Sequence, residues 1–256
     1  MRIDFFKYQG TGNDFIMLDN LNGQYDAINV KAIQFLCDRK FGVGADGLIK
    51  LSSHSEFDFE VEYYNSDGSQ SFCGNGARCS IAFANRLGLI DVETNFVAID
   101  GAHRGKIVND TVFLEMSDVS VLNRDGDDYV LDTGSPHYVH FKNPNEEVDI
   151  VKFGKEVRYS AKYKTEGINV NFIEEVNPNE VFVETYERGV EDETLSCGTG
   201  VTACALVLMH DKNIENVIVK TKGGTLGVSA EKDGQGFTNI WLSGPAELVF
   251  NGSVDI

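Results

Sequence analysis

Hydrophobic residues along this chain alternate with polar ones, or cluster, in many short stretches. Stretches of about four to eight residues that are rich in aromatic and β-branched side chains are typical of strands. In the first half of the sequence they cover residues 2–8, 15–19, 48–51, 57–64 and 112–116. In the second half they cover residues 128–134, 137–141, 169–176, 180–186, 217–221 and 239–244. The pattern therefore predicts two sheet-rich regions.

Two further stretches predict helices of an unusual composition. Residues 77–88 and 201–212 place alanine and cysteine on several faces of the helix, which favours helices surrounded by packing over helices on a surface. Residues 30–41 form a third helical stretch. The predicted fold class is α/β (α+β), with two sheet-rich domains, each wrapped around one central helix.

The two regions repeat one another in sequence. The pattern CGxG occurs at Cys73 and again at Cys197, 124 positions later (197 minus 73). TGN at Thr11 is echoed by TGS at Thr133, 122 positions later (133 minus 11), and EVEYYNSDG is echoed in the same order by FVETYERG. The repeat predicts two similar domains, residues 1–118 and residues 119–256, with a last strand that can cross back to the first half.

The charge balance narrows the range of partners. The chain carries 22 Lys and Arg against 40 Asp and Glu, a formal net charge of −18. Such a surface repels the phosphates of nucleic acids and anionic lipids, so we expect neither nucleic acid nor membrane as a partner. A small anionic substrate is still allowed, because a single arginine and a few amide groups can bind it.

The cysteine content and the N-terminus point to a reducing compartment. No stretch approaches the roughly 18 apolar residues of a membrane span, and the N-terminus has no apolar segment long enough for a signal peptide. Five cysteines, an odd number without a secretion signal, indicate reduced thiols and not a disulfide framework. We expect a cytoplasmic protein.

Neither a dinucleotide site nor a metal site is predicted. Residues 42–47, GVGADG, match G-x-G-x-x-G but follow a helical stretch and precede a strand, whereas a dinucleotide-binding turn runs from strand to helix. The cysteines lack metal-ligand spacing, and no histidine pair lies near them. Three cysteines inside predicted helices are interpreted as buried structural thiols: Cys37, Cys79 and Cys204.

The remaining two cysteines, Cys73 and Cys197, each lie directly before a predicted helix. A helix N-terminus binds anions and stabilises a neighbouring thiolate. Nucleophilic catalysis needs one cysteine with a histidine, and redox catalysis favours a closely spaced pair. Two equivalent thiols suit the inversion of a carbon acid instead, in which a thiolate removes a proton and a thiol on the opposite face returns one. The substrate carboxylate then lies between the two helix N-termini.

Six segments, in order, carry a resemblance to a known family: KYQGTGNDF, FGVGADGLI, YYNSDGSQSFCGNGARC, TGSPH, NVNFI and YERGVEDETLSCGTG. They cover most of the chain and closely resemble the diaminopimelate epimerase family of cofactor-independent amino-acid racemases and epimerases. The resemblance implies two pseudo-two-fold-related domains, each a curved mixed sheet or barrel around a central helix. It implies interconversion of LL- and meso-2,6-diaminopimelate for lysine and peptidoglycan precursors, with no cofactor. Members are often dimers, which implies a homodimer.

The resemblance also implies roles for individual residues. Cys73 and Cys197 correspond to the acid–base pair. Backbone N–H groups would hold the reacting carboxylate at Gly74, Asn75, Gly198 and Thr199. Side chains would contact the substrate at Asn13, Asn65, Ser135, Asn169, Glu187 and Arg188. Glu187 would accept from an ammonium group, Arg188 would clamp the distal carboxylate bidentately, and His137 and Glu187 would tune the pKa values of the thiols.

Two positions depart from the family pattern. Ser135 stands where the family usually has asparagine, and Gly47 stands where some members have glutamine. Because a hydroxyl is shorter and has fewer hydrogen-bonding sites, we expect one contact to the distal end of the substrate to be lost or bridged by water.

Two alternative functions stay open at this point. One is a cofactor-independent racemase of the same fold acting on proline, hydroxyproline or histidine, which Arg188 beside Glu187 disfavours. The other is a non-catalytic binding protein that has kept the fold.

Overall fold

The computed structural model describes residues 1–143 and 146–256. The chain divides into two compact units. Unit 1 comprises Met1–Leu114 and Gly244–Ile256, and unit 2 comprises Glu115–Ser243. The division after residue 114 falls slightly before the boundary inferred from the sequence at residue 118.

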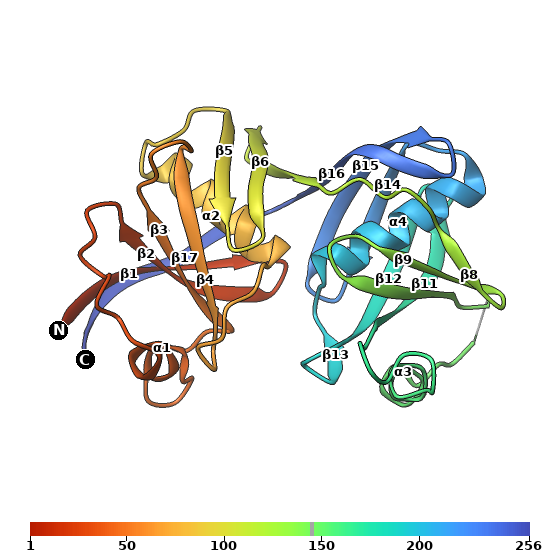
Figure 1. Cartoon of the computed structure of the whole chain (residues 1–256), viewed down its shortest axis with the longest axis horizontal. Coiled ribbons are helices and arrows are strands. Elements are labelled where there is room, and N and C mark those ends of the chain that lie inside the picture. Colours follow the sequence, from red (N-terminus) through yellow and green to blue (C-terminus); the bar gives the residue numbers. More distant parts are fainter. Residues whose placement is uncertain (144–145) are drawn as a thin grey trace. The chain divides into compact units, whose positions relative to one another are not determined.

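Unit 1 is a mixed sheet with two helices (Figure 1). Its strands are β1 (Arg2–Gly10), β2 (Asn13–Asn20), β3 (Gly47–Ser52), β4 (Phe59–Asn65), β5 (Glu93–Ala98), β6 (Gly101–Val108), β7 (Thr111–Met116) and β17 (Glu247–Asp255). Neighbours pair in the order β17-β1-β2-β3-β4-β5-β6-β7. The pairs β2–β3 and β4–β5 are parallel, and the others are antiparallel.

Unit 2 repeats this arrangement. Its strands are β8 (Asn123–Asp125), β9 (Asp128–Asp132), β10 (Pro136–Phe141), β11 (Asn169–Asn177), β12 (Glu180–Glu187), β13 (Asp192–Thr194), β14 (Asn216–Thr221), β15 (Gly224–Asp233) and β16 (Gly236–Gly244). They pair in the order β8-β9-β10-β11-β12-β14-β15-β16, and β13 adds to β12. The parallel pairs, β10–β11 and β12–β14, occupy the same places in the order as those of unit 1.

The strand registers match as well as the order. Phe15 pairs with Gly47 in unit 1, and His137 pairs with Asn169 in unit 2. Leu48 pairs with Tyr64, and Val170 pairs with Tyr186. Each residue of the second pair lies 122 positions after its counterpart (for example 186 minus 64), which is the offset of the sequence repeat.

Each unit is built around one buried helix, as the sequence predicts. Helix α2 (Gly74–Arg86) packs against β1, β2, β3, β4 and β6, and α4 (Gly198–Lys212) packs against β9, β10, β11, β12, β14 and β15. All residues of α2 from its start through Ile81 are buried, and most of α4 is buried. Both helices start three residues before their predicted starts, so the glycines of CGxG belong to their first turns.

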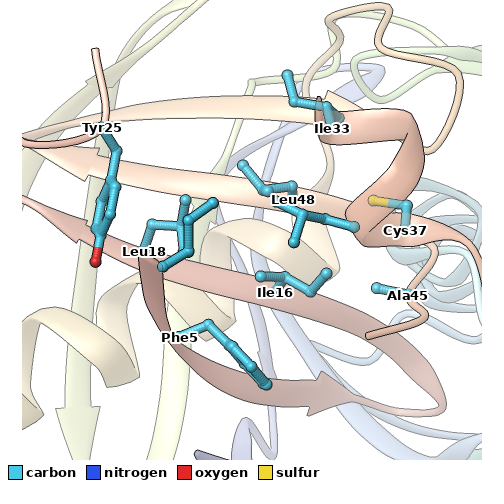
Figure 2. Close-up of a cluster of buried hydrophobic side chains, with 10 residues drawn as sticks. Phe5, Ile16, Leu18, Tyr25, Ile33, Cys37, Ala45 and Leu48 are labelled. Atoms are coloured by element: carbon cyan, nitrogen blue, oxygen red, sulfur yellow. The ribbon is translucent and has the colours of Figure 1, made fainter. Parts of the chain in front are cut away.

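The other two helices cover small apolar cores. Figure 2 shows the core beneath α1 (Val30–Cys37), where side chains of that helix meet side chains of β1, β2 and β3. Helix α3 (Ile150–Arg158), which the sequence analysis missed, covers a similar core on β10, β11 and β12. Helix α1 ends four residues before its predicted end, because Asp38 is already extended. Within the described ranges, no helix has the length and apolar character needed to cross a membrane.

Candidate active site

Cys73 and Cys197 occupy the same structural position in their units. Each is the N-cap residue of the central helix and has an extended backbone, with φ −137° and ψ 114° for Cys73 and φ −118° and ψ 112° for Cys197. Neither cysteine forms a disulfide. The carbonyl oxygen of each accepts the first helical hydrogen bond, from Ala77 N and Val201 N, at 2.8 Å. The backbone N–H groups of the next residues belong to a first helical turn, where no intrahelical acceptor exists.

The second glycine of each CGxG motif lets the helix approach the sheet. A Cβ at Gly76 would lie 3.0 Å from Ile49 Cδ1, and a Cβ at Gly200 would lie 2.4 Å from Asn171 Oδ1. A Cβ at Gly200 would therefore force the Asn171 side chain or the helix start to move, and a Cβ at Gly76 would crowd the tip of the Ile49 side chain. In both units the glycine leaves room for a side chain of the sheet beside the helix start.

In unit 1, Asn13 faces the Cys73 thiol. Asn13 Oδ1 accepts from Cys73 Sγ at 3.5 Å and from Asn75 Nδ2 at 3.4 Å, while Asn13 Nδ2 donates to Asp46 Oδ2 at 2.7 Å. Asn75 Oδ1 in turn accepts from Arg78 Nη2 at 3.1 Å. Four polar side chains therefore form one chain of hydrogen bonds that passes the thiol.

Arg78 is the one charged side chain deep in α2. It is fully buried, and its Nε and Nη1 have no hydrogen-bond partner among the described residues. Burial lowers the pKa of Arg78, and the Cys79 and Cys73 thiols oppose that shift. Burial also raises the pKa of the Cys79 thiol to about 12, so Cys79 stays protonated, in agreement with its interpretation as a structural thiol.

Asn65, predicted to line the site, ends β4. Its Oδ1 accepts from the Tyr63 hydroxyl at 2.9 Å. A Cβ at Gly47 would lie 2.4 Å from Tyr63 Cε2 and 2.6 Å from the Tyr64 carbonyl oxygen. The Tyr63 ring thus fills the space beside Gly47 that a longer side chain at position 47 would need.

In unit 2, Thr199 links His137 to Cys197. His137 Nε2 lies 2.9 Å from Thr199 Oγ1, which lies 3.5 Å from Cys197 Sγ. The other ring nitrogen, Nδ1, lies 3.0 Å from Asn171 Nδ2. Burial lowers the pKa of His137 to about 3, with a further lowering from the positive charge of Arg188. The ring is therefore neutral at physiological pH.

The remaining predicted contacts lie together beyond β11 and β12. Asn169 Oδ1 accepts from the backbone N–H of Arg188 at 2.8 Å, and Asn169 Nδ2 donates to Ser135 Oγ at 3.0 Å. Arg188 Nη2 donates to Ser135 Oγ at 3.3 Å, and Nη1 donates to the Glu166 carbonyl oxygen at 2.8 Å. Ser135, which departs from the family pattern, thus orients the guanidinium of Arg188, and half-buried Glu187 is the last residue of β12.

Sequence reasoning missed several polar residues that hold these groups. Thr133 Oγ1 donates to the Thr199 carbonyl oxygen at 2.9 Å, and Thr185 Oγ1 donates to Asn171 Oδ1 at 2.9 Å. Asn171 lies two residues after Asn169 and so on the same face of β11, a signal that was present in the sequence. Among residues 1–143 and 146–256, His, Cys, Asp and Glu side chains form no group of three or more suited to a metal ion.

Comparisons with known structures define the fold. A Bacillus anthracis protein of the phenazine biosynthesis PhzF family superposes with a TM-score of 0.76 at 15% identity, covering all of both chains. A probable proline racemase from Agrobacterium radiobacter superposes with a TM-score of 0.69 at 14% identity, covering 99% of this chain and 93% of that one. The chain therefore has the fold shared by the PhzF proteins and proline racemases.

Sequence comparisons then give the family. The family model for diaminopimelate epimerase matches residues 5–119 and 129–249. A diaminopimelate epimerase from Flavobacterium psychrophilum is 47% identical over 253 residues, covering 97% of this chain and 99% of its own. One from Chlorobaculum tepidum is 35% identical, covering 96% and 99%. The chain belongs to the diaminopimelate epimerase family.

Proposed function

We propose that this chain is an isomerase that interconverts LL- and meso-2,6-diaminopimelate without pyridoxal phosphate. The observation that carries the proposal is the pair of cysteine thiols at Cys73 and Cys197, each at the N-cap of a buried central helix and at equivalent positions of a duplicated fold. Family membership supplies the substrate.

In the proposed reaction the two sulfurs act on opposite faces of one α-carbon. The sulfur that starts as a thiolate takes the α-proton, so the C–H bond breaks and its electron pair stays on carbon. The other sulfur gives its proton to the opposite face of the same carbon and becomes a thiolate. The reverse reaction exchanges the two roles. A single thiol cannot serve both faces, so each unit supplies one.

The carboxylate beside the reacting carbon is bound by helix N-termini in this proposal. Backbone N–H groups of Gly74 and Asn75 on α2, and of Gly198 and Thr199 on α4, point along helix axes whose dipoles favour negative charge. As the α-proton leaves, negative charge spreads into this carboxylate. The N–H groups then stabilise the carbanion more than the ground state, which is how they accelerate the reaction.

The distal end of the substrate is recognised by a different set of groups. Arg188 binds the distal carboxylate, and Glu187 accepts from the distal ammonium. The contacts of Ser135 and Asn169 with Arg188 hold the guanidinium and its backbone in place for this role. Asn13 and Asn65 line the site from unit 1.

We extend the proposal to the setting of the reaction. The product supplies lysine and peptidoglycan precursors, the enzyme works in the cytoplasm, and it forms a homodimer, as members of this family often do. Sedimentation velocity of the purified full chain tests the last point: a species of twice the chain mass is expected, and a monomer at micromolar concentration would contradict it.

The experiment for the reaction itself is α-proton exchange followed by NMR. The protein is incubated in D₂O under reducing conditions with LL-diaminopimelate, and in parallel with proline, hydroxyproline and histidine. Deuterium at one stereocentre of diaminopimelate, together with meso product, is expected. Exchange in another amino acid alone would show that the substrate is that amino acid, while the two-thiol mechanism would stand.

Single cysteine variants test the roles of the thiols. Cys73→Ser and Cys197→Ser should each lose turnover, and Cys79→Ser, a buried thiol on α2, serves as the matched control. Full turnover in either of the first two variants would reject the epimerase mechanism and favour a binding protein with structural thiols.

A further inference from the structure

The turn that carries Arg188 connects β12 to β13 over residues 187–191. The three residues in the middle of this turn are exposed, so apolar burial contributes little to holding it. The N–H of Glu191 closes the turn on the Glu187 carbonyl oxygen at 2.8 Å. Gly189 and Glu191 both have a positive φ, of 95° and 59°. A non-glycine residue seldom adopts such a backbone conformation, which persists where surrounding contacts hold it.

The carboxylate of Glu191 supplies those contacts. Its Oε1 accepts from the Gly189 N–H at 3.1 Å, inside the turn, and lies 3.5 Å from Arg158 Nε. Its Oε2 accepts from the hydroxyls of Tyr159 and Tyr186, both at 2.8 Å. One side chain of the turn therefore has four partners.

The partners of Glu191 outside the turn come from two elements of unit 2. Tyr186 is a buried residue of β12, while Arg158 ends α3 and Tyr159 is the C-cap of that helix. Helix and strand meet closely at this point, because a Cβ at Gly154 of α3 would lie 2.4 Å from the Tyr186 ring. The Glu191 carboxylate thus ties the turn to both the sheet and the helix that covers it.

These contacts join a charged acceptor to protonated donors. Burial raises the pKa of the Glu191 carboxyl, but the Gly189 N–H, the two tyrosine hydroxyls and the charge of Arg158 outweigh burial and lower the pKa. The hydrogen bond to Glu191 raises the pKa of Tyr159, and burial together with the same kind of bond raises the pKa of Tyr186. Charge-assisted hydrogen bonds are stronger than neutral ones, so the turn is held firmly.

Arg188 lies inside the segment that Glu191 closes. The Arg188 backbone N–H donates to Asn169 Oδ1, which holds the start of the turn, and Glu191 holds its end. A Cβ at Gly167 would lie 2.6 Å from Arg188 Cδ and 2.8 Å from Arg158 Cζ, so both arginine side chains pass beside this glycine. Neighbouring cations repel one another, and the Glu191 carboxylate beside Arg158 offsets that repulsion.

The equivalent turn of unit 1 is built from different side chains. The position equivalent to Glu191 holds Ser69 (191 minus 122). Tyr64, the equivalent of Tyr186, donates at 3.2 Å to Glu62 of its own strand and not to the turn. The carboxylate with four partners therefore belongs to the unit that also carries the proposed distal clamp.

We propose that Glu191 is a positioning residue for Arg188. By tying the turn to α3 and β12, its carboxylate holds the Arg188 guanidinium where it binds the distal carboxylate of the substrate. The inference rests on the proposed function of Arg188 as distal clamp. Glu191 accordingly determines affinity for the distal end and leaves proton transfer at the α-carbon to the two thiols.

Steady-state kinetics of Glu191→Ala with diaminopimelate test the proposal. KM should rise about 10-fold, as expected when a hydrogen bond to a charged group is weakened, with kcat within about twofold. Charge removal alone predicts the opposite sign, because losing a negative charge near Arg188 favours the binding of an anionic group.

Asp192→Ala is the matched control for the charge. It removes the same charge one position further along, where the carboxylate accepts from the Glu193 N–H at 2.8 Å. KM of this variant should stay at the wild-type value or fall. A KM for Glu191→Ala that is no higher than that of Asp192→Ala overturns the proposal.

A milder pair of variants tests one contact without truncating Glu191. Tyr186→Phe keeps the buried ring and removes only the hydroxyl, so KM should rise about threefold. Tyr64→Phe makes the same change at the equivalent position of unit 1 and should keep the wild-type KM. In the Glu191→Ala background, Tyr186→Phe should have no further effect on KM. Fully additive effects would contradict the proposed route from Tyr186 through Glu191 to Arg188.

Limited trypsin digestion gives a readout that does not depend on turnover. Cleavage after Arg188 requires the turn to open, so it should be at least about fivefold faster in Glu191→Ala than in wild-type protein or Asp192→Ala. Unaltered cleavage would show that Glu191 does not hold the turn and would refute this inference alone. Absence of exchange with diaminopimelate in wild-type protein would instead refute the proposed function.

Discussion

The hydroxyl of Thr199 offers a sharp test of how the site controls Cys197. In Thr199→Val the side chain keeps its shape and the backbone N–H stays in the first turn of α4. The variant loses the hydroxyl that lies 2.9 Å from His137 Nε2 and 3.5 Å from Cys197 Sγ. Two consequences follow, one for the thiolate and one for the histidine.

The magnitudes come from those two contacts. A hydrogen bond to a charged group contributes roughly 1.5–3 kcal/mol. We expect the Thr199 hydroxyl to donate one to Cys197 in its thiolate form, so the variant should raise the pH midpoint for alkylation of Cys197 by iodoacetamide by about one to two pH units. Exchange of the substrate α-proton should slow by roughly 10- to 100-fold. The buried His137 Nε2 loses its hydrogen-bond partner, which should lower the free energy of unfolding by about 1–3 kcal/mol.

Thr202→Val is the matched control. It makes the same change on the same helix, but the Thr202 hydroxyl donates at 2.9 Å to the Gly198 carbonyl oxygen within the helix. Alkylation midpoints, exchange rates and thermal unfolding are measured for both variants. If Thr199→Val matches Thr202→Val in the Cys197 midpoint and in exchange, the Thr199 hydroxyl does not act on the sulfur and the reasoning is refuted.

Three further predictions follow from single contacts. Arg188→Lys cannot reproduce the fork to Ser135 and Glu166, so steady-state kinetics should show KM for diaminopimelate raised about 10-fold with kcat within about twofold; an unchanged KM would exclude Arg188 as the distal clamp. Gly47→Ala forces a Cβ to within 2.4 Å of Tyr63 and should lower stability in calorimetry by about 1–3 kcal/mol; wild-type stability would contradict this. The pKa of His137 falls from 6.5 to about 3 on folding, so between these pH values the unfolded chain binds a proton that the folded chain does not. The free energy of unfolding should therefore be unaffected by His137 above pH 6.5 and should fall by about 1.4 kcal/mol per pH unit as the pH drops from 6.5 toward 3. His137→Gln should remove that part of the slope in urea unfolding measured at several pH values, and an unaltered slope would count against it.

The sequence predicted the strands that alternate clearly and missed those that do not. Strands β5, β6 and β15 carry glycine or charged residues among few large apolar ones, and much of β17 is exposed, so their pattern is weak. Helix α3 was missed for a tertiary reason. Its Gly154 lowers helix propensity, yet a Cβ there would lie 2.4 Å from the Tyr186 ring. Such a requirement is visible only once the helix is packed on β12.

The candidate site divides in the same way. Motif order and the position before a helix were enough to single out Cys73 and Cys197. The contacts that orient their neighbours were not predictable, because Asp46 reaches Asn13 across 33 positions and His137 reaches Thr199 across 62. No local pattern encodes such pairs. They arise from parallel strand pairing that brings distant residues to the start of one helix.

The duplication explains why some site residues are repeated and others have diverged. The proposed chemistry treats both faces of the reacting carbon alike. For this step the two units have retained the same local structure, an N-cap cysteine followed by a glycine beside the sheet. The distal end of the substrate carries one carboxylate and one ammonium, so a single set of binding residues is enough for it. At the equivalent strand ends Asn65 differs from Glu187, and the equivalent positions 47 and 169 hold glycine and asparagine. The proposed distal clamp, Arg188, accordingly belongs to unit 2. The same divergence gives the two sulfurs different neighbours, the Asn13 amide oxygen at Cys73 and the Thr199 hydroxyl at Cys197, each at 3.5 Å, although the proposed two-base proton transfer uses both sulfurs alike.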